Sequence, residues 1–134
     1  MLGELKDEGR IVIGDLEAGI GTVLRLERGD VDLVLIVAQP TVKSLDVAAR
    51  ALRITANRSL ALVVANRVRD QADVELIRAA LGQEHELVEV PEDAVIAHAD
   101  EQGTAPIDST EASPGVDALI ALAERIRTSA VRSR

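Results

Sequence analysis

The hydrophobic positions of the chain alternate between short, nearly continuous aliphatic runs and longer segments with helical spacing. The runs are predicted strands, at Arg10–Asp15, Asp32–Ala38, Leu60–Ala65 and Glu86–Val90. A strand with one solvated face alternates apolar and polar residues, but the first three runs are almost entirely aliphatic. We therefore expect these strands to be covered on both faces, as the strands of a parallel sheet are.

Three further segments space their apolar residues by three or four positions, which predicts amphipathic helices. Their apolar stripes consist of Val42, Leu45, Ala49, Leu52 and Ala56, of Val74, Ile77 and Leu81, and of Val116, Leu119, Ile120, Ala123, Ile126 and Ala130. Asp70 or Asp73 is the expected N-cap of the second helix, and Gly82 is its expected stop. The third helix follows Ser113-Pro114, a favourable helix start.

The alternation of strands and helices extends over the whole chain. A shorter helical pattern covers Ala94–Gln102, and the irregular stretch Glu101–Gly115 is short enough to be a surface loop. The chain has 134 residues, which is the usual length of one domain. We predict a single α/β domain of residues 1–134, with a parallel β-sheet flanked by helices on both faces.

Composition restricts the chemistry that this domain can support. Fifteen Lys and Arg against 23 Asp and Glu give a net charge of −8, and Phe, Tyr and Trp are absent. Nucleic-acid binding needs clustered cations and stacking platforms, so it is not expected. Without cysteine, thiol, disulfide and iron–sulfur chemistry are excluded. No apolar run is long enough for a membrane span or a signal peptide, so we expect a cytoplasmic location and no membrane partner.

Polar residues at the carboxyl ends of the predicted strands are the candidate site, because open α/β sheets bind ligands at that edge. Asp15 ends the first strand and Gly19 follows, a layout that suits a magnesium-bound water and a phosphate, or an ordinary strand-to-turn exit. Asn66 ends the third strand, and its amide suits a purine edge or a turn cap. The segment Pro91–Asp93 ends the fourth strand and is also a good helix start.

The order of these segments resembles the second half of MinD/ParA-type P-loop ATPases. The matching segments are IVIGDLEAGI, LVLIVAQPTVKSLDVAARAL, LVVANRVRD and VEVPEDAVIAHADEQGTAPID. The likeness is greatest to the CooC subgroup, ATPases associated with nickel insertion into carbon monoxide dehydrogenase. It extends from about Ile11 to Asp108, and the C-terminal helix fits it as well. The resemblance implies a three-layer, incomplete Rossmann-like fold.

The resemblance also implies roles for individual residues, and ATP and Mg²⁺ as cofactors. Asp15 matches the Walker B acid that would bind the metal, Gly19 matches the switch glycine, and Glu17 lies in the same loop. Asn66 matches the asparagine that recognises the base. The segment that would line the purine matches Pro91, Glu92 and Asp93.

The chain departs from this family in the parts that bind phosphate. The family's Gly-rich K-G-G-x-G-K-(S/T) loop is missing, because Gly19-Ile20-Gly21-Thr22 contains no Lys, and the paired cysteines of the CooC subgroup are missing too. Positioning and neutralising the phosphates is most of phosphoryl-transfer catalysis. We therefore do not expect this chain alone to hydrolyse ATP, and whether it is an enzyme stays open. The alternative function is a non-catalytic assembly or regulatory module that keeps the fold.

The phosphate-loop half of these ATPases is missing from the sequence, and this affects which strands of the sheet can pair. In the proteins that the chain resembles, the phosphate-loop strand lies between the strands that match Arg10–Asp15 and Asp32–Ala38. Buried backbone groups are rarely left unpaired, so we predict direct pairing of these two strands, with Ile13 beside Leu35; a foreign strand or a detached N-terminal segment is the alternative. Uncovered apolar faces predict a homodimer, or a partner chain that supplies the phosphate-loop half, and Gln39-Pro40 matches a loop near the dimer face of such proteins.

Overall fold

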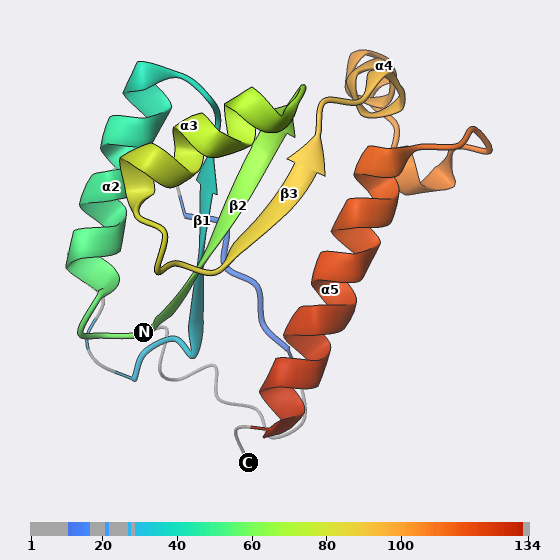
Figure 1. Ribbon diagram of the computed structural model, residues 1–134. Coiled ribbons are helices and arrows are strands. Elements are labelled where there is room, and N and C mark those ends of the chain that lie inside the picture. The colour runs from blue at the N-terminus through green and yellow to red at the C-terminus, as the bar shows by residue number, and fades with distance from the viewer. Residues whose placement is uncertain (1–10, 17–20, 22–26, 28, 133–134) are drawn as a thin grey trace.

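Three parallel strands form the sheet at the centre of the molecule (Figure 1). The computed structural model describes residues 11–16, 21, 27 and 29–132. Strands β1 (Leu33–Ala38), β2 (Leu60–Val68) and β3 (Leu87–Pro91) lie in the order β1-β2-β3, and both neighbouring pairs are parallel. Helix α2 (Val42–Thr55) connects the first pair and helix α3 (Gln71–Leu81) connects the second. The predicted α/β class is confirmed.

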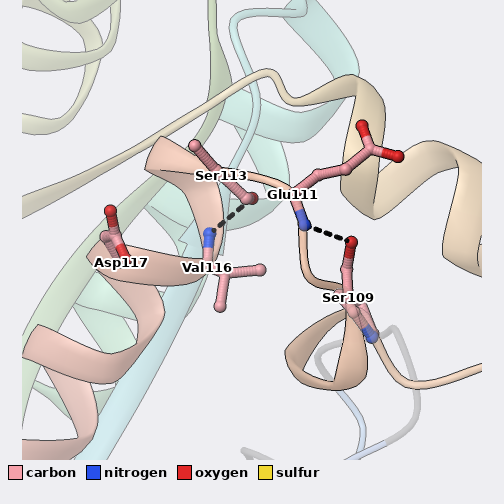
Figure 2. A pocket seen from close by; sticks show the side chains of 7 residues that line it. Ser109, Glu111, Ser113, Val116 and Asp117 are labelled. Carbon is pink, nitrogen blue, oxygen red and sulfur yellow. Dashed lines mark hydrogen bonds between the residues drawn. The ribbon is translucent and has the colours of Figure 1, made fainter.

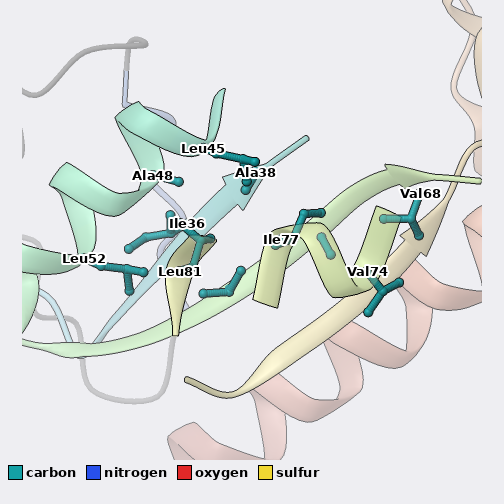
Figure 3. Packing of buried hydrophobic residues seen from close by; sticks show 11 residues of the cluster. Ile36, Ala38, Leu45, Ala48, Leu52, Val68, Val74, Ile77 and Leu81 are labelled. Carbon is teal, nitrogen blue, oxygen red and sulfur yellow. The ribbon is translucent and has the colours of Figure 1, made fainter. Parts of the chain in front are cut away.

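Helices cover both faces of this sheet and divide the core into two layers. On one face, α2 and α3 pack over the strands (Figure 3), and the buried residues are Ile36, Ala38, Leu45, Ala48, Leu52, Val63, Ala65, Val68, Val74, Ile77 and Leu81. On the other face, α5 (Pro114–Arg132) packs with Leu122 against Leu62, Val64 and Val90. The side chains of β2 are buried on both faces of the sheet. This burial explains its continuous aliphatic run, as the sequence predicted.

Capping side chains set where the helices begin and end. Asp70 is the N-cap of α3, since its carboxylate accepts from the backbone N–H of Asp73 at 3.1 Å, and Gly82 is the C-cap at φ 103°. Helix α4 (Ala94–Gln102) has the bounds predicted from its pattern, and Gly103 ends it in the left-handed region. The predicted loop before α5 contains one short 3₁₀ turn, η2 (Pro106–Asp108).

The buried face of α2 differs from the predicted stripe. Val42 and Ala56 are exposed, whereas Ala48 and Thr55 are buried. Val42 opens the first turn and is 87% exposed, and Ala56 is the C-cap after the last turn. Thr55 tolerates burial because its hydroxyl donates to the Leu52 carbonyl oxygen at 3.2 Å, within the helix.

The buried face of α5 also differs from the prediction. Leu122 is buried, while Leu119, Ile120 and Ala123 of the predicted stripe are exposed. Within the described chain, α5 is the only long helix on its face of the sheet, and it contacts mainly β3. A helix without a neighbour on its own layer buries only the narrow strip that touches the sheet, so the flanks of its apolar stripe stay in water.

The predicted strand Arg10–Asp15 is not a strand in its described part. Residues 11–16 have no regular secondary structure, and Ile13 is 80% exposed. The prediction that Ile13 pairs beside Leu35 is therefore wrong, and the detached alternative with a three-stranded sheet is the one observed. The physical reason is coverage: α5 packs mainly over β3, so a strand added outside β1 would have one bare face.

Candidate functional site

The carboxyl ends of β2 and β3 meet at an irregular place in the sheet. Asn66 pairs with Val90, but the next pair is Val68 with Pro91, so Arg67 is an extra residue in β2. Arg67 has φ 58°, in the left-handed region that non-glycine residues rarely adopt. Such a bulge bends the strand and changes the direction of its end. Beyond it, the backbone N–H of Glu92 donates to the Val68 carbonyl oxygen at 2.9 Å, which extends the contact between the two strand ends.

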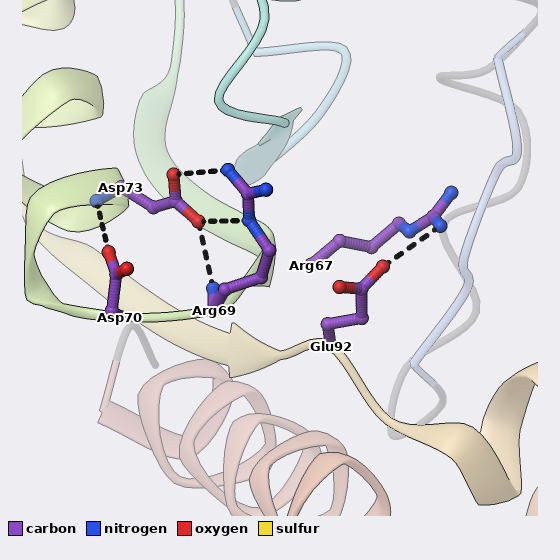
Figure 4. Close-up of polar contacts among 5 residues, drawn as sticks. All are labelled: Arg67, Arg69, Asp70, Asp73 and Glu92. Carbon is purple, nitrogen blue, oxygen red and sulfur yellow. Dashed lines mark hydrogen bonds and ion pairs between the residues drawn. The ribbon is translucent and has the colours of Figure 1, made fainter.

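Two oppositely charged side chains bridge these strand ends at the surface (Figure 4). Arg67 Nη2 lies 3.1 Å from Glu92 Oε1, and both side chains are about half exposed. Asn66 is partly buried one residue before this pair. The fold thus brings Asn66, Pro91 and Glu92, which are distant in sequence, to adjoining positions at one edge of the sheet.

A second charged pair fixes the turn from β2 into α3. The Asp73 carboxylate accepts from Arg69 Nε at 2.9 Å, from Arg69 Nη2 at 3.0 Å and from the Arg69 backbone N–H at 2.9 Å (Figure 4). The side-chain hydrogen bond from Arg69, and then its backbone N–H, hold the pKa of Asp73 below its usual value, and the same pair raises the pKa of Arg69. The four-residue spacing of Arg69 and Asp73 is the only sign of this pair in the sequence, and it was not predicted.

Asp93, predicted to line a purine, joins two helices. Its Oδ1 accepts from the Val95 N–H at 2.8 Å and caps α4, while its Oδ2 accepts from Ser113 Oγ and the Gly115 N–H, both at 2.8 Å. The Gly115 N–H and then the Ser113 hydroxyl hold the pKa of Asp93 below its usual value. These hydrogen bonds occupy both carboxylate oxygens and attach the start of α4 to the start of α5.

The predicted magnesium site is only partly within the described residues. Asp15 is exposed in the irregular segment 11–16, and Glu17 and Gly19 lie outside the described residues. No group of three His, Asp or Glu side chains that could hold a metal ion occurs among the residues that the structure describes. At the end of β1, the Gln39 N–H donates to Ser44 Oγ at 2.9 Å, and Pro40 is partly buried beside it.

A shallow, open depression of about 160 Å³ lies between η2 and the start of α5 (Figure 2). It is lined by Pro106, Ser109, Glu111, Ala112, Ser113, Val116 and Asp117. The Ser113 hydroxyl already donates to Asp93 and accepts from the Val116 N–H at 3.1 Å. The Ser109 hydroxyl accepts from the Glu111 N–H at 3.2 Å. Both hydroxyls therefore form hydrogen bonds that stabilise the loop. The depression is an open hollow on the surface.

Comparison with known proteins gives this chain neither a matching family model nor a matching curated protein. Across the part of the chain that the structure describes, every helix is too short or too polar to span a bilayer. The geometry at the carboxyl ends of β2 and β3 is therefore the main guide to function.

Proposed function

We propose that this chain is a nucleotide-associated domain of the CooC/MinD type, which contacts the purine of ATP and does not hydrolyse it alone. The supporting observation is the register between β2 and β3, which sets Asn66 opposite Val90, the residue that precedes Pro91 and Glu92. The resemblance implies that these segments enclose the base. Parallel topology predicts that these segments lie at one edge of the sheet, and the register gives the residues that oppose each other there.

The chemistry of this edge suits a base better than a phosphate. The Asn66 amide can donate and accept at the same time, as the edge of a purine does. The Arg67–Glu92 pair is solvent-exposed, so either member can exchange its partner for a ligand at little cost. No Lys-bearing Gly-rich loop is present for the phosphates, and the net charge is −8. Mg²⁺, with Asp15 as its proposed ligand, would have to offset the charge of ATP.

Titration of the full chain with ATP and with GTP, with and without Mg²⁺, tests this proposal through backbone amide chemical shifts. We expect shifts at residues 66–69 and 90–92, and Asn66→Ala is expected to weaken binding about tenfold, the effect of one hydrogen bond to a ligand. Asn57→Ala is the matched control, because Asn57 is exposed in the loop after α2. Shifts elsewhere, or equal effects of both substitutions, would contradict a purine site at this edge.

The second candidate function is a non-catalytic assembly module, whose partner is either a second copy or a chain that supplies the phosphate-loop half. The observation that favours it is the outer edge of β1, which has no neighbouring strand among the described residues. A chain that binds no nucleotide but associates through this edge would support the second candidate over the first.

A further inference from the structure

The two edges of the sheet differ in their protection against pairing. The β3 edge contains Glu89, ends at Pro91 and is followed by Glu92, whereas β1, LVLIVA, contains neither a charge nor a proline. Folded proteins prevent edge-to-edge pairing with charged residues, prolines and bulges. The β1 edge has none of these devices, and a six-residue aliphatic edge without them is a template for another strand.

Side chains on β1 also show that its coverage is incomplete. Ile36 and Ala38 are buried beneath α2 on one face. On the α5 face, Leu33 and Leu35 are partly buried and Val37 is 56% exposed. A strand placed beside β1 would satisfy its outer backbone groups and remove Val37 from water.

We propose that this strand is β1 of a second copy, so that two sheets join into one continuous six-stranded sheet. A two-fold axis perpendicular to the sheet makes the two β1 strands antiparallel and keeps each α5 face on the same side. Directly opposed residues of antiparallel strands point to the same face of the sheet. The two-fold axis must therefore pass between one residue of β1 and the same residue of the second copy. With Leu35 on the axis, Val37 lies opposite Leu33 of the other copy.

Charge complementarity at the ends of β1 selects a second copy as the occupant. Asp32 precedes β1, and Lys43 lies in the first turn of α2 after it; both are exposed, and neither forms an ion pair within the described part of the chain. Antiparallel pairing brings Asp32 of each copy to the end of β1 where the other copy holds Lys43. The same attraction occurs twice by symmetry, whereas parallel pairing would set like charges together.

The same contrast between edges predicts a closed dimer. After two copies have joined through β1, the outer strands of the combined sheet are two copies of β3, with Glu89 and Pro91 on each. These residues oppose further strand addition. The inference goes beyond the proposed nucleotide site, since the interface would lie along the outer edge of β1, whereas the purine would lie at the carboxyl ends of β2 and β3, and either can fail without the other.

Sedimentation equilibrium of the full chain over a wide concentration range tests the interface. We expect a dimer that does not grow with concentration. Val37→Lys, which adds a charge to the edge, is expected to weaken dimerisation at least tenfold. Leu76→Lys is the matched control, because Leu76 is 49% exposed on α3 and away from β1. Far-UV circular dichroism of both variants verifies that they are folded.

Charge exchange tests the antiparallel arrangement separately. Asp32→Lys and Lys43→Asp are each expected to weaken the dimer several-fold, and the double variant is expected to recover it. A monomeric wild-type chain, or a dimer that Val37→Lys leaves intact, overturns the proposal. Dissociation by Ile13→Lys but not by Val37→Lys also overturns it, because residues 11–15 of the second copy would then be the pairing strand.

Discussion

Two aspartates, Asp73 and Asp93, have structural roles that the residue types alone do not reveal. Asp73 is 7% exposed and receives three hydrogen bonds from Arg69, and Asp93 receives one from each of Val95, Ser113 and Gly115. Both carboxylates hold their connections in the ionised form, because every one of these partners donates a proton. Their pKa values are therefore lowered in the folded chain.

These lowered pKa values predict a loss of stability in acid. A carboxylate with a lowered folded-state pKa stabilises the fold above its ordinary pKa of 3.8, and this stabilisation is lost as the pH falls through that value towards the folded-state pKa. We expect the melting temperature, followed by circular dichroism, to fall steeply below about pH 4.5.

Substitution assigns the acid effect to these residues. Asp73→Asn and Asp93→Asn are each expected to melt lower at neutral pH and to lose less stability between neutral and acidic pH than the wild type. Asp100→Asn, at an exposed position of α4, is the control and is expected to follow the wild-type curve. Equal pH dependence in all four proteins would show that other groups govern acid unfolding.

At the scale of elements, the junction of α4 and α5 depends on one glycine. A Cβ on Gly115 would lie 2.7 Å from Ile96 Cδ1 and 2.9 Å from Asp93 Cβ, closer than nonbonded carbons approach. Gly115→Ala is therefore expected to destabilise the fold by about 1–3 kcal/mol, the usual cost of overpacking. Urea unfolding followed by circular dichroism measures this.

A second substitution locates the cause of the Gly115 effect. If the clash with Ile96 is responsible, shortening that side chain in Gly115→Ala/Ile96→Val recovers part of the lost stability, although Ile96→Val alone lowers it. A Gly115→Ala variant as stable as the wild type would mean that the two helices do not approach as closely as described.

The sequence predicted where the helices and strands lie better than it predicted which faces of the helices are buried. Aliphatic runs and caps located β1 to β3, α3 and α4, because hydrophobic period and capping chemistry are local properties. The faces of α2 and α5 depend on what packs over them, and the N-terminal segment depends on whether a neighbour covers it. The adjacency of Asn66 and Pro91 followed from parallel topology, whereas the left-handed Arg67 belongs to a bulge that no local pattern marks. The four-residue spacing of Arg69 and Asp73 allows an ion pair, but spacing alone does not show the fork that they form.

At the scale of the whole molecule, we expect the charge balance to disfavour phosphoryl transfer by this chain alone. With 15 basic against 23 acidic residues and no Lys-bearing phosphate loop, it has little to neutralise the γ-phosphate in a transition state. We expect the purified chain to release no phosphate from ATP above the uncatalysed background, measured with and without Mg²⁺. Magnesium-dependent release that Asp15→Ala abolishes would contradict this expectation.

The unequal covering of the two sheet faces affects how the molecule opens. Two helices protect one face, but within the described chain α5 alone covers Leu62, Val64 and Val90 on the other. If α5 detaches, β1 to β3 can remain paired beneath α2 and α3, so the opening is local and costs less than global unfolding. The open species would display a bare aliphatic surface on an otherwise folded chain, and such surfaces cause aggregation. We therefore expect the rate of aggregation to depend on how firmly α5 is docked on the sheet.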